Sequence, residues 1–179
     1  MTNSQPKSGR SRRYALEPAA AFANREAAYF VAALDELSQR LFDLIEDLPS
    51  PLLDFVPENG ANSIAKLTLH MADAEASWNA RISGKTVSLE LIADLQRGQQ
   101  TVPCPYESAE LIRLCQRVRE EILKPAVTDL VDIDAQVVNH EKITSVRELL
   151  LHQIWHWTYH TGQVGLLRRL SKARYRWNF

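Results

Sequence analysis

Three histidines recur every four residues toward the end of the 179-residue chain: His152, His156 and His160. In a helix, residues four apart lie about 40° apart around the axis and about 6 Å apart along it, so two neighbours in this series can share one metal ion. All three cannot, because His152 and His160 would be about 12 Å apart along the axis, whereas a zinc–nitrogen bond is about 2 Å long. A third ligand must therefore come from another segment.

His70 is the natural candidate for that ligand. In a helix through residues 64–78 it lies at the edge of the apolar stripe, from which an imidazole can point into a helical bundle. A single histidine is more often an ordinary core or surface residue, but four of the five histidines fall on two predicted helices. This pattern predicts one divalent metal ion. His140 lies in a connection without a spaced partner and is interpreted as a surface residue.

Two other metal chemistries fit these residues less well. Residues 156–160 have no Glu directly after the first His, so the general base of an HExxH metalloprotease is missing. A di-iron bundle needs Glu-x-x-His on two helices, and the chain contains no such string. Three histidine ligands would leave zinc an open position that can hold water or a substrate atom.

The histidines fall on two of four segments with apolar residues at helical spacing. The segments run from Ala27 to Leu48 before Pro49, from a cap at Asn62 or Ser63 to Gly84, from Ser108 until Pro125 kinks or ends the helix, and from Ser145 to Leu170. The last is apolar on most sides, which predicts a central or doubly covered helix. A short helix at 89–95 and a hairpin of 136–138 with 142–144 are expected in the connections. We expect an all-α fold, a four-helix bundle with at least one crossover connection.

Length and composition suit one domain, at residues 16–179, after a flexible tail at 1–15 that is rich in Ser, Gly and basic residues. The net charge is -1, and the basic stretches at the two ends lack recognition motifs, so no nucleic-acid partner is expected. No signal-peptide core or membrane span is present, which predicts a cytoplasmic protein. Cys104 and Cys115 lack CxxC spacing and are interpreted as ordinary thiols.

Two stretches resemble the DinB/YfiT-like family of four-helix bundles. Residues 62–75, with Trp78 and 81–84, are similar to its second helix, and residues 148–170 are similar to its fourth; the likeness spans about residues 20–179. The resemblance implies a three-histidine site of His70, His156 and His160, commonly for zinc or nickel, and a homodimer.

Other residues near this pattern have less definite roles. His152 fits a supporting position of the family, so ligation by His152 and His156 stays open as an alternative. Gln163 shares the helical side of His156 and His160, where it either orients a ligand imidazole or makes a plain bundle hydrogen bond. Trp157 and Tyr159, like Trp155, are interpreted as core and pocket-wall residues.

The resemblance also implies a reaction. Relatives include bacillithiol S-transferases and a mycothiol-dependent maleylpyruvate isomerase, in which the metal activates a low-molecular-weight thiol. Our leading hypothesis is metal-dependent transfer of such a thiol co-substrate to a small electrophile. Metal-dependent hydrolysis and a non-enzymatic, stress-associated metal-binding module are the alternatives.

Overall fold

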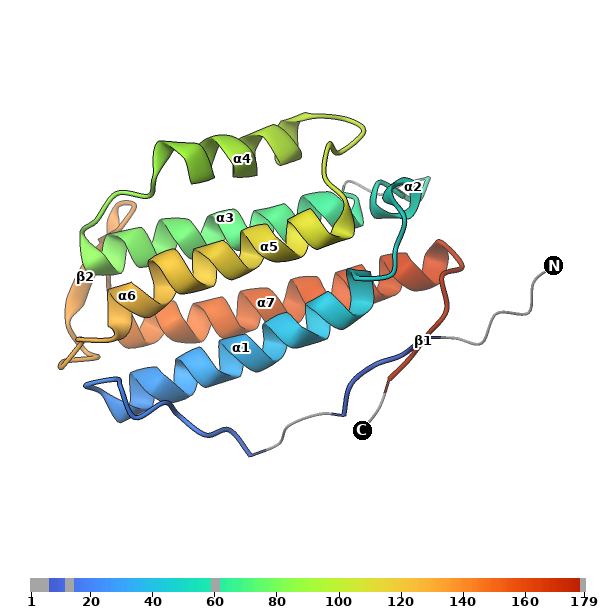
Figure 1. The fold of residues 1–179 in the computed structure, drawn as a ribbon. Helices are drawn as coiled ribbons and strands as arrows, with labels where there is room; N and C mark the ends of the chain where they lie inside the picture. Colours follow the sequence, from blue (N-terminus) through green and yellow to red (C-terminus); the bar gives the residue numbers. More distant parts are fainter. Residues whose placement is uncertain (1–6, 12–14, 59–61, 178–179) are drawn as a thin grey trace.

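Four long helices form the body of the protein in the computed structural model, which describes residues 7–11, 15–58 and 62–177 (Figure 1). These helices are α1 (Arg25–Ile45), α3 (Ile64–Ser83), α5 (Ser108–Val118) and α7 (Val146–Leu170). α1 packs mainly on α7, and α3 packs on both α5 and α7. Because α1 and α3 follow each other in the sequence but are not main packing partners, their connection crosses the bundle. The predicted all-α bundle with a crossover is confirmed.

The ends of the two histidine-bearing helices follow from local sequence. The Ser63 hydroxyl accepts a hydrogen bond from the backbone N–H of Lys66 at 3.2 Å and caps α3. Gly84 ends the same helix with a φ of 66°, a left-handed conformation that costs glycine little. At the start of α7, Ser145 and Glu148 form a reciprocal capping box. Both helices therefore start and stop where the sequence predicts.

The third helical path continues beyond Pro125. After α5 come a π-helical turn, η1 (Arg119–Leu123), and a short helix, α6 (Lys124–Val127), with the proline in its first turn. A proline cannot donate a helical hydrogen bond, and the π-helical turn stands directly before the place where that donor is missing. Of the two predicted alternatives, a kink or an end of the helix at Pro125, the second is wrong, because the helical path continues to Val127 after a change of helical type just before the proline.

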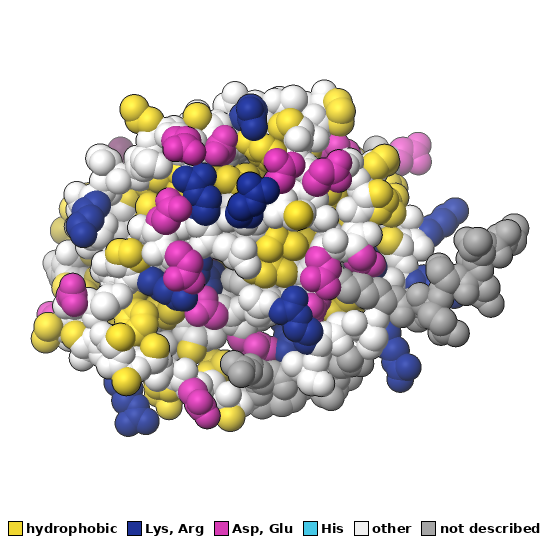
Figure 2. Space-filling view, viewed as in Figure 1, with side chains coloured by type: hydrophobic (Ala, Val, Ile, Leu, Met, Phe, Trp, Pro, Cys, Tyr) yellow, Lys and Arg dark blue, Asp and Glu magenta, His cyan; other side chains and the backbone are white. Residues whose placement is uncertain are grey.

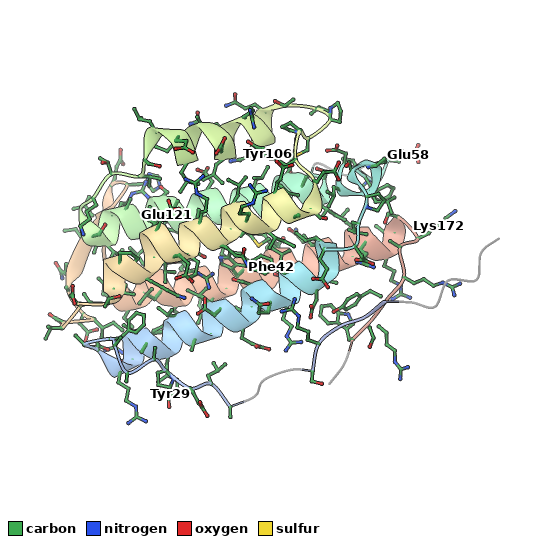
Figure 3. All side chains as sticks on the ribbon, in the orientation of Figure 1. Tyr29, Phe42, Glu58, Tyr106, Glu121 and Lys172 are labelled. Carbon is green, nitrogen blue, oxygen red and sulfur yellow. The ribbon has the colours of Figure 1, made fainter. Side chains whose placement is uncertain are left out.

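The connections carry smaller elements: α2 (Ser50–Leu53), α4 (Leu89–Gln100) and a hairpin of β2 (Gln136–Asn139) with β3 (Lys142–Ser145). The predicted short helix and hairpin are confirmed. α4 lies over α3 and α5, with Tyr106 labelled beneath it in Figure 3. A Cβ on Gly98 would lie 2.5 Å from Leu69 Cδ1 and 2.6 Å from the Tyr106 ring, so a glycine permits this close approach.

The first described residues pack against the end of the chain. β1 (Lys7–Ser8) pairs in parallel with β4 (Tyr175–Arg176), and the Arg10 guanidinium lies 2.7 Å from an Asp43 carboxylate oxygen. Residues 7–11 of the predicted flexible tail are thus connected to the rest of the chain by backbone pairing and an ion pair. The rest of that prediction, at 1–6 and 12–14, lies outside the described residues.

α7 is buried along one face and open along the opposite face. Trp157 and Val164 are 1% and 0% exposed on the core side. Five apolar side chains lie on the outer side, and we call them the α7 stripe: Leu151, Trp155, Tyr159, Leu166 and Leu170, which are 39–65% exposed. The sequence predicts a central or doubly covered helix; α7 packs on both α1 and α3, but its outer face is not covered in the single chain. No helix among the described residues combines the length and apolarity needed to cross a membrane.

Candidate metal centre

Helices α3 and α7 bring three of the five histidines together. His70 lies on the flank of α3 that faces α7, and His156 and His160 lie on successive turns of α7. The Nε2 atoms of His70 and His156 are 3.0 Å apart. One ring nitrogen from each of the three histidines lies within 4.8 Å of the others. These are the three residues that the sequence singles out as ligands.

The spacing of these nitrogens suits a small metal ion. Three nitrogens bound tetrahedrally to zinc at about 2.0–2.1 Å lie about 3.4 Å from one another. The separations in the structure, from 3.0 Å up to 4.8 Å, bracket that value. Small side-chain rotations would therefore bring the three nitrogens to the separations that a tetrahedral zinc ion needs. Imidazole ligands suit zinc, nickel, copper and iron.

The protonation of the cluster favours ligation. Burial, together with the neighbouring His160, His70 and His152, lowers the pKa of His156 to about 3. Burial and His160 also lower the pKa of His70, against the opposing effect of the Asp73 carboxylate. A metal binds only the neutral imidazole, so His70 and His156 offer lone pairs at neutral pH without first losing a proton.

Gln163 contacts one of these imidazoles directly. Its Oε1 lies 2.7 Å from Nδ1 of His160, a distance at which that nitrogen donates a hydrogen bond to the amide oxygen. The contact places the proton on Nδ1 and leaves the lone pair on Nε2. This is the contact that the ligand-orienting interpretation of Gln163 requires.

Trp78 is a neighbour of the cluster that the sequence does not single out. Its ring meets those of His152 and His156 edge-on, at centroid distances of 4.8 and 5.0 Å. His152 is exposed, and its ring lies 6.3 Å from that of His156, outside the converging group. The place of Trp78 could have been predicted from its spacing, because it follows His70 by eight residues and so lies on the same flank of the helix.

The two aromatic residues expected at the pocket lie in different places. Tyr159 is 65% exposed, and its ring centroid lies 5.1 Å from that of His160, so it stands at the rim of the cluster. Trp157 faces the core, with the Arg119 guanidinium 5.4 Å from its ring centroid. It does not wall the cluster. His140 occupies the exposed turn between β2 and β3, with a φ of 54°, as a surface residue should.

The cluster is not on the face shown in Figure 2, where no histidine is visible. Charged side chains of both signs lie on that face instead (Figure 2). The two described cysteines are both buried and free, as expected of ordinary thiols.

A helical bundle with three converging imidazoles on one surface belongs to the class of four-helix bundles with a candidate metal centre between helices. Comparison with known families identifies it more narrowly. The model of the DinB superfamily matches residues 33–164, and the chain belongs to that family.

Individual relatives agree with this assignment. Protein DinB of Bacillus subtilis (strain 168) is 28% identical over 148 residues, which are 76% of this chain and 81% of that protein. A DinB-like protein from Bacillus cereus ATCC 10987 superposes with a TM-score of 0.61 at 13% identity, over 80% of this chain and 91% of the other. YfiT from Bacillus subtilis superposes with a TM-score of 0.60 at 14% identity, over 92% of this chain and 94% of the other. It is described as a probable metal-dependent hydrolase with an unusual four-helix bundle topology.

Proposed function

We propose that the protein binds one divalent metal ion, zinc or nickel, through His70, His156 and His160, and transfers a low-molecular-weight thiol to a small electrophile. The observation that carries the proposal is the convergence of three imidazole nitrogens within 4.8 Å of one another. A three-histidine set leaves the ion room for a further ligand.

Thiol transfer requires few protein groups other than the metal ligands. A metal bound there would lower the pKa of an incoming thiol and favour its thiolate, which is the nucleophilic form. In the transfer, the thiol proton passes to solvent, a carbon–sulfur bond forms at the electrophile, and the leaving group departs with its bonding electrons. The histidines hold the site, Gln163 orients His160, and Trp78 and Tyr159 flank the rings. No general base from the chain is required.

Metal-dependent hydrolysis is the second candidate, in which water takes the place of the thiol. Two observations favour it. YfiT, which shares the fold, is described as a probable metal-dependent hydrolase. The Asp73 carboxylate is near enough to His70 to raise its pKa, and a carboxylate beside the cluster can accept a proton from water.

Metal analysis followed by a thiol panel tests the proposal. We expect about one divalent ion per chain in protein purified without chelator or nickel resin. The cobalt-substituted protein should show a sulfur-to-metal charge-transfer band with one of bacillithiol, mycothiol, glutathione or cysteine, and should consume that thiol together with an electrophile. Turnover without any thiol would support hydrolysis. Neither band nor turnover on fully metallated protein would overturn thiol transfer.

We also propose that a second copy of the chain covers the α7 stripe. A row of large exposed apolar side chains on one helix face is typical of a protein–protein interface. Light scattering of the purified protein should give twice the mass of the 20.4 kDa chain. Trp155→Glu in the middle of the stripe should yield monomers, whereas a dimer that survives this change would place the interface elsewhere.

A further inference from the structure

A recess lies between α3 and α4, near the candidate metal centre. It has a volume of about 580 Å³, and we call it the α3–α4 groove. Its apolar lining comes from Ala76 and Ala80 on α3 and from Val87, Ile92 and Leu95 on the facing segment. Apolar recesses of this size with a few polar groups are typical of small-molecule sites.

The groove begins next to the histidine cluster. Asp73 lines it and lies one turn after His70 on α3, so the two side chains are surface neighbours. Ser77 and Arg81 continue the same flank at intervals of four residues and also line the groove. A molecule in the groove can therefore reach the candidate ligands.

The far part of the groove carries positive charge. Arg81 and Lys85 both line it, and neither makes an ion pair with any residue that the structure describes. Arg81 Nη1 donates a hydrogen bond to Ser77 Oγ at 2.7 Å, so the guanidinium folds back over the preceding turn. Ser77 follows His70 by seven residues, which is about 10 Å along the helix. Four of the five guanidinium N–H groups remain for a ligand.

We propose that the α3–α4 groove binds the electrophilic substrate of the metal centre, and that this substrate is an elongated apolar molecule with an anionic end such as a carboxylate. This inference rests on the proposed function. The anionic end pairs with Arg81 and Lys85, the apolar body lies on Ala76 and Ala80, and the reacting end lies about 10 Å away at the histidines. Asp73 repels an anion at the near end, so the charges fix the direction in which the substrate binds.

Octanoate is a suitable probe, because it pairs an apolar chain with one carboxylate. We expect octanoate, titrated into the ¹⁵N-labelled protein, to shift the backbone amide signals of Ala76, Ala80 and Ile92. The double variant Arg81→Gln/Lys85→Gln should weaken octanoate binding about tenfold or more, since it removes charge-assisted hydrogen bonds. Octan-1-ol should bind less tightly than octanoate and should not respond to the double variant.

Two single variants sharpen the test. Ala80→Leu fills the groove without changing its charge and should also weaken octanoate binding. Arg113→Gln removes an exposed cation from α5, outside the groove, and should leave binding unchanged. Equal binding of octanoate and octan-1-ol, or octanoate shifts confined to other elements, would overturn the inference.

Metal content measured on the same samples separates this inference from the proposed function. His156→Ala should lose the metal and keep octanoate binding. Normal metal uptake with no binding in the groove would overturn the inference alone. Octanoate binding in a wild-type protein that takes up no metal would overturn the proposed function, and the groove would remain a site for an elongated anionic molecule without being the substrate site of a metal centre.

Discussion

Helix α3 carries two polar clusters on different flanks, and they differ in how their polar atoms are paired. Toward α5 and η1, the fully buried Glu75 carboxylate accepts two hydrogen bonds from Arg119, at 2.7 and 2.8 Å. The same guanidinium also donates to Asp35 at 2.7 Å and to Ser38 at 2.9 Å. Each charge in this cluster therefore faces an opposite charge or a hydrogen-bond partner within the chain.

The histidine cluster toward α7 is only partly paired within the chain. Its three rings converge without a carboxylate in the group, and the buried Nδ1 of His156 has no hydrogen-bond partner among the described residues. A buried polar group without a partner costs stability, and in native structures it calls for a specific explanation. The contrast indicates that the Arg119 cluster serves the fold, whereas the histidine cluster has capacity left for a ligand from outside.

Breaking the paired cluster should have the largest effect. Glu75→Ala leaves Arg119 buried without its main partner and should lower the free energy of unfolding by about 3–5 kcal/mol in urea denaturation. Glu121→Ala is the matched control, because Glu121, labelled in Figure 3, pairs with Arg117 while 48% exposed. It should cost less than about 1 kcal/mol. Similar losses in the two variants would remove the structural distinction.

Removing a member of the histidine cluster should affect metal affinity more than folding. His156→Ala and His70→Ala should each weaken metal binding about a hundredfold or more, because an incomplete ligand set remains. Competition with a chromophoric chelator measures the loss. His140→Ala, at the exposed turn, is the control and should bind normally. Unchanged metal content in both ligand variants would eliminate the proposed site.

A smaller effect is expected at Gln163. Gln163→Ala removes the acceptor for Nδ1 of His160 and should weaken metal binding about tenfold, the low end of the range for such supporting contacts. Gln163→Glu keeps an acceptor there and should restore most of the affinity. If both variants bind as wild type does, the hydrogen bond belongs to the bundle alone.

The smallest expected effect is on the pH dependence of the metal-free protein. An unfolded His156 takes up a proton below its ordinary pKa of 6.5, whereas the folded residue stays neutral until about pH 3. The unfolded state therefore binds more protons in this window, and stability should fall as the pH drops from about 6.5 toward 3. In urea denaturation at pH 7.5, 6 and 5, the free energy of unfolding of His156→Gln should fall less with decreasing pH than that of wild type. The difference between the two slopes should be less than the value for one proton, about 1.4 kcal/mol per pH unit. A steeper loss in the variant would contradict the depressed pKa.

Much of the fold was predictable because it depends on neighbours in the sequence. Helical spacing of apolar residues, the Ser63 cap and the Gly84 stop all act within one or two turns, so α3 and α7 could be located closely. The spacing of His156 and His160 also required a third ligand from elsewhere. At Pro125 local sequence predicts a kink or an end of the helix, because a proline removes one helical hydrogen bond, but it does not decide whether the helical path continues.

Only the tertiary structure decided which residues far apart in the sequence are in contact. The helical spacing of His152, His156 and His160 is the same for both adjacent pairs, and only the packing of α3 on α7 brings His70 to the second pair. Arg119 and Glu75 are 44 residues apart and show no pattern that would pair them. The α7 stripe has the composition of a buried face, and its exposure follows from which helices are present to cover it. Periodicity tells which face of a helix is apolar or ligating, but the partner of that face depends on how the whole chain packs.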